Sequence, residues 1–232
     1  MPTPNALERA AAARVHAALP RLKVFPLPQA VLFPGVAMPL HIFEPRYRAL
    51  VRDALATDGV FALAGLEEGW ETDTTGSPPL RRVACAGVIT WHERLPQGRY
   101  NLLLEGHLRI GISAEHPQEG PYREVAAELL GTPGGDELPP GAPEEAAVRQ
   151  ALLELATLLP REAAQVLVRE GARARGGALA DVVAAAVVAD GGRRRALLEE
   201  LSPRVRLLAV MEDMSEVLAQ LRTRARPAGL PN

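Results

Sequence analysis

The chain has 232 residues, of which 47% are hydrophobic and 23% charged, and its formal net charge is -2. This composition is ordinary for a folded protein of one large or two small domains, and the small net charge excludes an overall field that attracts nucleic acid or an anionic membrane. The single cysteine, Cys85, excludes an internal disulfide framework and indicates a reducing compartment, so we expect a cytoplasmic protein.

The first residues do not have the pattern of a targeting segment. Charged residues interrupt the alanines of residues 5–19, whereas a secretory signal needs a continuous apolar centre. No run in the chain approaches the ~20 apolar residues that cross a bilayer, so we expect no membrane partner. Residues 1–20 are therefore predicted to form a short helical extension or a loosely held arm.

Residues 22–48 are apolar, but prolines divide them into short pieces. Because proline fixes φ and removes a backbone donor, it is confined to strand edges, turns and first turns of helices. The pattern predicts short extended segments followed by a helix that begins at Pro45 and ends at Asp58-Gly59. Its apolar residues have the i, i+3, i+4, i+7 spacing of one buried helix face: Tyr47, Leu50, Val51, Ala54 and Leu55.

Strand-length runs follow this helix. They are residues 60–66, 83–92, 100–104, 108–113 and 122–130, with turns at 95–99 and 116–120 and an exposed loop at 67–79. Glu105-Gly106 interrupts the longest extended stretch, as a β-bulge or a close backbone approach does. This part of the chain is therefore predicted to be rich in β structure.

Residues 131–143 hold four glycines and four prolines, and after them the apolar period changes from 2 to 3.6. Helices are predicted around 148–159, 166–170, 179–187, 193–201 and from Ser202-Pro203 onward, with a basic, glycine-rich loop at 171–177. The final helix carries a stripe that we interpret as core more than as an oligomer seam: Leu207, Met211, Met214, Leu218 and Leu221. The predicted divisions are 1–20, 21–131, a linker at 132–143, a helical bundle at 144–222 and a tail at 223–232.

Motifs of catalysis are missing from the sequence. Lys23 is the only lysine, and it does not follow a glycine or have a serine nearby, which excludes a P-loop and disfavours a Ser–Lys dyad. Neither G-x-G-x-x-G nor G-x-S-x-G occurs. Cys85 and His92 lie seven apart in one predicted strand, on opposite faces, so a small core cysteine is a better interpretation than a nucleophile.

Metal and nucleic-acid motifs are equally weak. His92-Glu93 begins an H-E-x-x-H pattern, but Pro96 occupies the last position. His41 and Glu44 precede the helix and favour a polar turn over a ligand pair. The three arginines at 193–195 favour a solvated face over a nucleic-acid patch. We therefore expect no metal, no cofactor and no enzymatic activity.

A family resemblance rests on the proline-divided segment. Phe25-Pro-Leu-Pro, Val31-Leu-Phe-Pro-Gly and Pro39-Leu-His-Ile-Phe-Glu-Pro-Arg-Tyr-Arg closely resemble the start of the N-terminal substrate-binding domain of Lon proteases. Further similar segments occur in the same order: Gly87-Val-Ile, the turn at Gly98, Leu103-Leu-Glu-Gly-His-Leu-Arg-Ile, Pro121-Tyr122, Ala180-Asp-Val-Val-Ala-Ala, Leu197-Leu-Glu and Arg206-Leu207. The resemblance covers roughly residues 22–221.

This resemblance implies an α+β fold: a PUA-like twisted β-barrel with one helix, followed by a C-terminal α-helical bundle. It also implies recognition of unfolded or damaged polypeptides, as an adaptor to a separate ATP-dependent protease or as a holdase. Complete Lon proteases continue into ATPase and Ser–Lys protease modules, for which this sequence has no motifs. We therefore expect a stand-alone, non-catalytic binding protein, and weak homo-oligomerisation stays open.

The same segment supplies the candidate client contacts, which are Phe33, Pro34, His41, Phe43, Glu44, Pro45 and Arg46. Among them, Phe33, Pro34 and the 44–46 corner are expected to be outer positions, whereas Val24, Leu32, Ile42 and Tyr47 are expected to build the core. RNA binding is the alternative by analogy to the PUA shape, although a pI near 6.2 and few aromatic residues argue against it. A hydrolase that uses Cys85 or a histidine is a third, weaker hypothesis.

Overall fold

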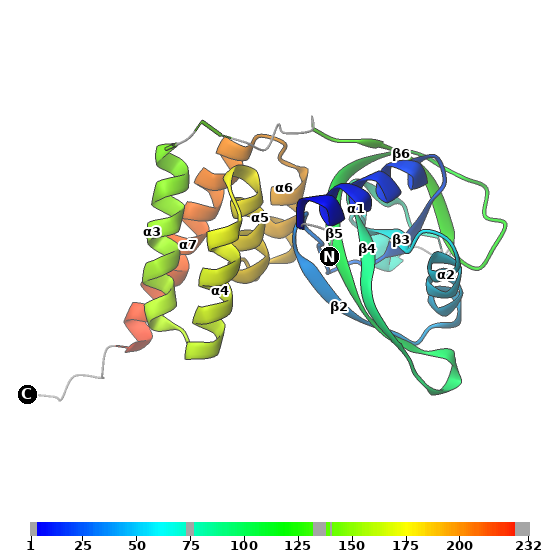
Figure 1. The fold of residues 1–232 in the computed structure, drawn as a ribbon, viewed down its shortest axis with the longest axis horizontal. Helices are drawn as coiled ribbons and strands as arrows, with labels where there is room; N and C mark the ends of the chain where they lie inside the picture. The colour runs from blue at the N-terminus through cyan, green and yellow to red at the C-terminus, as the bar shows by residue number, and fades with distance from the viewer. Residues whose placement is uncertain (1–3, 73–76, 132–137, 140, 226–232) are drawn as a thin grey trace, which may run out of the picture. The chain divides into compact units, whose positions relative to one another are not determined.

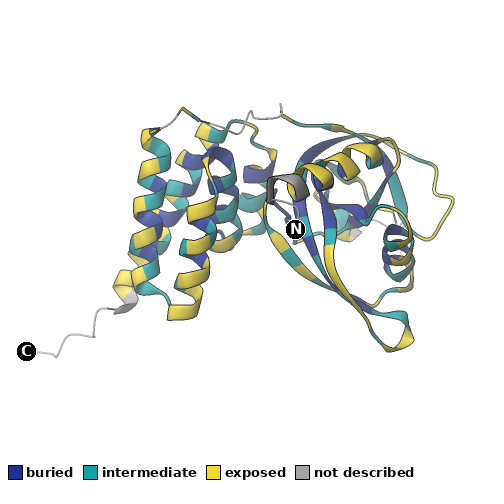
Figure 2. Ribbon diagram, viewed as in Figure 1, coloured by how far each residue is buried: buried dark blue, intermediate teal, exposed yellow. Residues whose placement is uncertain are grey.

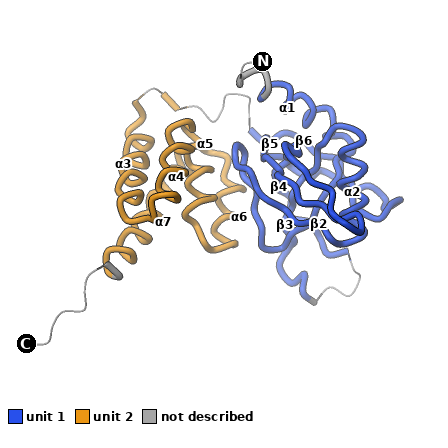
Figure 3. The backbone as a smooth tube through the Cα atoms, turned by 60° about the horizontal axis from the view of Figure 1, so that its bottom comes forward, with its two compact units in different colours: residues 1–131 blue, residues 132–232 orange. Residues whose placement is uncertain are grey.

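The computed structural model describes residues 4–72, 77–131, 138–139 and 141–225 (Figure 1). The chain divides into two compact units, residues 1–131 and residues 132–232, coloured separately in Figure 3. The first unit contains all the strands of the described residues, and the second is helical. In the described ranges no helix is long and apolar enough to cross a membrane.

Within the described residues, six strands of the first unit form one sheet. They are β1 (Leu22–Pro26), β2 (Ala37–Ile42), β3 (Val60–Leu66), β4 (Leu80–Arg94), β5 (Tyr100–Glu115) and β6 (Arg123–Leu129). Their order is β2-β5-β4-β3-β1-β6, and β6 also pairs with β5. Five strands, β5, β4, β3, β1 and β6, therefore close into a barrel.

The length of β5 explains how a sixth strand joins this barrel. Its first half, from Tyr100 to Glu105, pairs with β2, and its second half, from Ile110 to Glu115, pairs with β6. The strand β4 pairs along the other edge of both halves. Every pairing is antiparallel except that of β1 with β3, and α2 (Pro45–Ala56) lies between these two strands in the chain.

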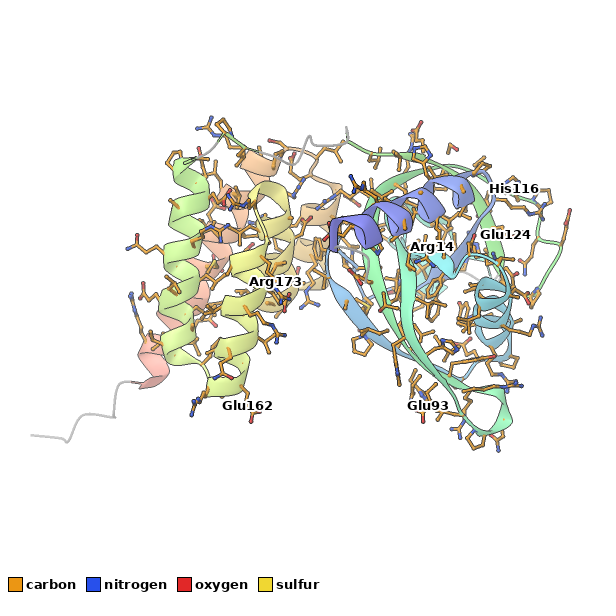
Figure 4. The ribbon with its side chains drawn as sticks, viewed as in Figure 1. Arg14, Glu93, His116, Glu124, Glu162 and Arg173 are labelled. Carbon is orange, nitrogen blue, oxygen red and sulfur yellow. The ribbon has the colours of Figure 1, made fainter. Side chains whose placement is uncertain are left out.

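The helix α1 (Pro4–Ala18) is part of the core of the barrel unit. Its Ala11 and Val15, with Leu19 of the following turn η1 (Leu19–Arg21), join a cluster built from one side of the strands. That cluster is Leu22, Val24, Val60, Ala62, Ala64, Ala84, Ala86, Val88, Ile110 and Val125. Small alanines on the strands leave room for the helix. Arg14, labelled in Figure 4, donates to the carbonyl oxygen of Asp58 at 3.1 Å. The segment is helical as expected, but it is not a loosely held arm.

The helix α2 begins at Pro45 and buries the predicted face, with Tyr47, Leu50, Val51 and Ala54 buried. The ring of Tyr47 lies 4.1 Å from that of Phe25, which in turn packs near Phe61. The backbone N–H of Gly59 donates to the carbonyl oxygen of Ala54 at 2.7 Å and ends the helix, with φ of Gly59 at +69°. The predicted core role of Val24, Leu32, Ile42 and Tyr47 is confirmed, since all four are buried.

The described helices of the second unit are α3 (Pro143–Leu158), α4 (Arg161–Arg173), α5 (Gly176–Val187), α6 (Gly191–Glu199) and α7 (Pro203–Ala225). Buried residues line the helix faces that meet in the bundle (Figure 2). The stripe of α7 belongs to this core, as interpreted, because Leu207, Met214 and Leu218 are buried. The expected α+β class, a twisted barrel followed by a helical bundle, is confirmed.

The predicted basic loop at 171–177 is wrong. Gly171 lies inside α4 and is buried, and α5 begins at Gly176 after a connection of two residues. The guanidinium of Arg149 donates to the carbonyl oxygens of Gly171 and Ala174, at 2.8 and 2.6 Å, and so satisfies the end of α4. Tertiary packing overrides the low helix propensity of glycine here.

Two predicted boundaries also differ. The helix predicted at 166–170 extends over Arg161–Arg173, and α7 continues to Ala225, past the predicted start of the tail. The rest of the predicted tail, 226–232, and residues 132–137 and 140 of the predicted linker lie outside the described residues.

Candidate functional site

Of the seven candidate residues, one is fully enclosed. Phe33 is completely buried, so its predicted outer position is wrong. Its backbone carbonyl group lies against Gly106 of β5, and the residues that follow it, Gly35 and Val36, form backbone hydrogen bonds with Gly106. Pro34 is half-buried. Nothing in the local sequence distinguishes an inward from an outward Phe33, because the contact that decides it is with a residue far along the chain.

The other five candidates form one surface feature, the β2–α2 corner, which we define as residues 41–46. Phe43 is 60% exposed, and the rings of Phe43 and His41 lie 6.1 Å apart with an interplanar angle of 24°. His41 Nδ1 lies 2.7 Å from Asn101 Oδ1 on the neighbouring strand, which holds the imidazole in place. Phe43 and His41 together give this corner an exposed aromatic surface.

The corner is held by the residues on either side of Phe43. Ile42 and Tyr47 are buried, so the connection between them must turn outward. Pro45 supplies the fixed φ of the first helical position. Glu44 is the N-cap residue but makes no capping hydrogen bond with its side chain; its carboxylate accepts instead from Arg46 Nε at 3.0 Å. The Arg46 guanidinium lies 4.5 Å from the centre of the Tyr47 ring.

Beside this corner lies a pocket of about 410 Å³, which we call the proline–aromatic pocket. Its volume is within the range of small-ligand sites. Its aromatic residues are Tyr47, Trp70 and Tyr122, and its prolines are Pro26, Pro28, Pro78 and Pro121. Of the predicted set, only Glu44 and Arg46 line it; Phe33, Pro34, His41, Phe43 and Pro45 do not.

Hydrogen bonds fix one wall of the pocket. Arg123 donates to both carboxylate oxygens of Glu115, at 2.5 Å each, and to the carbonyl oxygen of Pro78 at 2.7 Å. Near this wall, Arg21 pairs with Glu124 at 2.7 Å, and His116 Nε2 donates to the carbonyl oxygen of Pro20 at 2.9 Å (Figure 4). These contacts connect the start of β6 to the segment before β1.

The Tyr122 hydroxyl donates to Asp53 Oδ2 at 3.0 Å. Burial, together with this hydrogen bond and the charge of Asp53, raises the pKa of Tyr122 to about 12. Hydrogen bonds from Arg52 and then from Tyr122 lower the pKa of the Asp53 carboxyl, although partial burial opposes this. The phenol therefore stays neutral and joins β6 to α2.

Sequence reasoning missed the pocket because five separate segments build it: residues 26–28, 44–47, 66–71, 77–78 and 118–123. Only the prolines of these segments are a local signal, and at positions 26 and 28 a proline equally indicates the end of a strand or a turn. The remaining candidates have structural roles. Cys85 is buried, as expected. Arg193 pairs with Asp213 at 3.1 Å, and Arg194 donates to the carbonyl oxygen of Val188 at 2.5 Å, so these arginines are tied to their own unit more than solvated.

Among the described residues, no group of three or more His, Cys, Asp or Glu is placed to hold a metal ion. The protein is thus an α+β chain of two units, in which a small closed barrel with an exposed aromatic corner and a neighbouring pocket precedes a helical bundle.

The chain belongs to the family of the ATP-dependent protease La (LON) substrate-binding domain, which it matches over residues 21–216. It is 30% identical over 205 residues to a Lon protease of Roseiflexus castenholzii, covering 85% of this chain and 24% of that protein. It is 25% identical over 191 residues to Lon protease 2 of Myxococcus xanthus, covering 82% and 23%. The chain thus spans about a quarter of the length of these relatives.

Solved structures agree on the fold. The N-terminal domain of Mycobacterium avium complex Lon protease superposes with a TM-score of 0.63 at 19% identity, covering 84% of this chain and 98% of that one. A Lon N-terminal domain protein from Xanthomonas campestris gives a TM-score of 0.60 at 23% identity, covering 83% and 97%.

Proposed function

We propose that the chain is a non-catalytic recognition module that binds exposed apolar segments of unfolded or damaged polypeptides, and that the β2–α2 corner is a contact surface for them. The observation that carries this proposal is Phe43, which is 60% exposed in a member of a substrate-binding family. The stacked His41 ring enlarges its apolar surface, and the Glu44–Arg46 pair gives that surface a polar rim.

The test is binding of a permanently unfolded client, such as a reduced and carboxymethylated protein, with its native form as competitor. We expect saturable binding of the unfolded form only. Phe43→Ser should weaken it by at least about fivefold, since a buried aromatic anchor contributes on the order of 1–3 kcal/mol. Val166→Ser is the matched control, because Val166 is an exposed apolar residue of the other unit. Absence of client binding, or equal losses in the two variants, would contradict the proposal.

The adaptor and holdase roles differ in their readout. An adaptor speeds the digestion of a bound client by a separate ATP-dependent protease, and this gain disappears with Phe43→Ser. A holdase slows both aggregation and digestion. In either role the Cys85 thiol takes no part in catalysis, because it is buried among core residues. Client turnover by the purified chain alone that is lost on Cys85→Ser would refute the non-catalytic proposal.

A further inference from the structure

The proline–aromatic pocket contains two side-chain donors, the Tyr47 hydroxyl and the Trp70 indole N–H, that make no hydrogen bond with any residue the structure describes. Tyr47 is only 6% exposed; its ring packs against Phe25 and lies under the guanidinium of Arg46, and the residue lines the pocket. By contrast, the third aromatic residue of the pocket, Tyr122, already donates to Asp53. Neither the Tyr47 hydroxyl nor the Trp70 indole nitrogen is among the buried, unsatisfied atoms of the described residues, so water can reach both donors in the free protein. A ligand that offers acceptors in the right places can replace that water.

The walls of the pocket limit what that ligand can be. Pro26, Pro28, Pro78 and Pro121 have no backbone N–H, so these walls cannot supply the alternating donors and acceptors that an added β-strand needs. The two guanidinium groups are already compensated, Arg46 by Glu44 and Arg123 by Glu115. Glu71, an exposed carboxylate, also lines the pocket, so the site has no excess of positive charge that would attract an anion. The pocket therefore favours a ligand without a negative charge that offers hydrogen-bond acceptors and flat apolar surface.

A proline-bearing segment in the polyproline II conformation has these properties. Its backbone makes no internal hydrogen bonds, so its carbonyl oxygens are free to accept, and its prolines have no N–H that would lose hydration. Proline rings pack well against aromatic side chains, and the preformed helix loses little entropy on binding. Both donors of the pocket match the acceptors of such a segment.

We propose that the proline–aromatic pocket binds proline-bearing polypeptide segments in the polyproline II conformation, with the Tyr47 hydroxyl and the Trp70 indole N–H donating to carbonyl oxygens of the ligand. The proposal rests on the proposed polypeptide-binding function and names a class of client segment for it. The pocket would then be a second contact surface beside the β2–α2 corner. It would select bound segments by their backbone conformation as well as by their apolar side chains.

The two tryptophans of the chain provide the assay. Trp91 is 54% exposed on β4 and does not line the pocket, so Trp91→Phe leaves Trp70 as the only tryptophan. The full chain with this substitution is titrated with a synthetic peptide of repeated Leu-Pro-Pro units, and with a matched peptide in which alanine replaces each proline. We expect a saturable change in Trp70 fluorescence with the proline peptide, and binding at least about tenfold weaker with the alanine peptide.

Tyr47→Phe keeps the ring and its packing and removes only the hydroxyl. It should weaken binding of the proline peptide by about two- to tenfold, the effect of one neutral hydrogen bond. Tyr100→Phe is the matched control, because Tyr100 is another nearly buried tyrosine that does not line the pocket, and it should leave the affinity unchanged. Equal affinity for the two peptides, or equal affinity of Tyr47→Phe and Tyr100→Phe, overturns the inference.

The failures of the two proposals are distinguishable. If the unfolded client binds and the proline peptide does not, the pocket inference is wrong and the proposed function stands. If the proline peptide binds with the expected Tyr47 dependence and the unfolded client does not, the pocket is a peptide site and the recognition of unfolded clients is wrong. If neither binds, both are refuted.

Discussion

The backbone of Gly106 lies directly against the backbone of Phe33. A Cβ atom at position 106 would lie 2.2 Å from the Phe33 carbonyl oxygen and 3.0 Å from Cys85 Sγ. The Gly106 N–H donates to the Val36 carbonyl oxygen at 2.9 Å, and the Gly106 carbonyl oxygen accepts from the Gly35 N–H at 2.8 Å. This contact fixes the segment that leads into β2, and therefore also the corner at which β2 meets α2.

Gly106→Ala should destabilise the barrel unit by about 3 kcal/mol or more, because the obstacle is backbone and cannot rotate away. Gly120→Ala is the control, since no atom lies within 4 Å of a Cβ at that position. It should change stability by less than about 1 kcal/mol. Urea unfolding followed by tryptophan fluorescence reports on this unit, because Trp70 and Trp91 both belong to it. Similar midpoints for the two variants would contradict the close contact.

A second prediction concerns the buried ion pair of the helical unit. Arg206 Nε lies 3.3 Å from Asp181 Oδ1, and both side chains are 1% exposed. Arg206 Nη1 also donates to the carbonyl oxygens of Glu200 and Leu201, at 3.0 and 3.1 Å. Asp181→Ala should cost about 3–5 kcal/mol, since it leaves a buried cation without its carboxylate. Unfolding followed by far-ultraviolet circular dichroism measures this loss.

The double variant Asp181→Leu/Arg206→Met should be more stable than Asp181→Ala, because it removes both charges and refills their volume. The pair of Arg204 with Glu144, at 2.5 Å, gives the contrast, because the Arg204 side chain is 67% exposed although that of Glu144 is only 11% exposed. Arg204→Ala should cost clearly less than Asp181→Ala, because the guanidinium that it removes is already largely hydrated. Equal losses for Asp181→Ala and Arg204→Ala would show that burial does not set the cost of breaking these pairs.

The features predicted well from sequence are those that one residue type dictates locally. Pro45 precedes a run with helical spacing of apolar residues, and a proline in such a run is compatible only with the first turn of the helix. The helix α2 begins at this residue. Gly106 in an apolar strand indicates a bulge or a close approach, and the structure has both: the pairing register of β4 and β5 shifts between Ala86 and Gly87, opposite this point. Such positions constrain the backbone whatever the rest of the chain does.

The features that sequence reasoning missed depend on residues distant in the chain. Phe33 is inward because Gly106, 73 positions later by number, admits its backbone. Gly171 stays helical because it packs against Leu152 and because Arg149 binds the helix end. The pocket combines five segments whose separate sequences show only prolines and isolated aromatics. Local propensity carries no information about which of these segments meet.

A third prediction concerns Tyr122 at alkaline pH. Its pKa is raised to about 12, mainly because burial disfavours the phenolate, and next because of the hydrogen bond to Asp53. Since the unfolded value is about 10, the folded state favours the neutral phenol. The resulting stability is fully present below pH ~10 and is lost as the pH rises from ~10 towards about 12.

Tyr122→Phe removes this contribution. The difference in unfolding free energy between the wild type and Tyr122→Phe should therefore shrink as the pH rises through this window, in urea unfolding at a series of pH values. In an alkaline titration followed by tyrosinate absorbance, the variant should also lack one tyrosine that ionises late. A difference that stays constant with pH would show that the Tyr122–Asp53 contact does not control the titration.

The last prediction concerns the open edge of β2, whose pairing in the described structure is with β5 alone. The Gly106 N–H donates to the Val36 carbonyl oxygen, and in an antiparallel pair the backbone groups of every second residue point towards the partner strand. The backbone N–H and C=O groups of Met38, Leu40 and Ile42 therefore point towards β5. Ala37, Pro39 and His41 therefore present their backbone groups to the edge, where Pro39 has no N–H to offer.

Pro39→Val restores this donor and should increase concentration-dependent association, measured by sedimentation velocity. Pro39→Lys restores the same donor but adds a charge that opposes edge pairing, so it should stay like the wild type. If both variants associate equally, the restored N–H alone controls association and the added charge does not oppose it. If neither variant associates, Pro39 does not protect this edge.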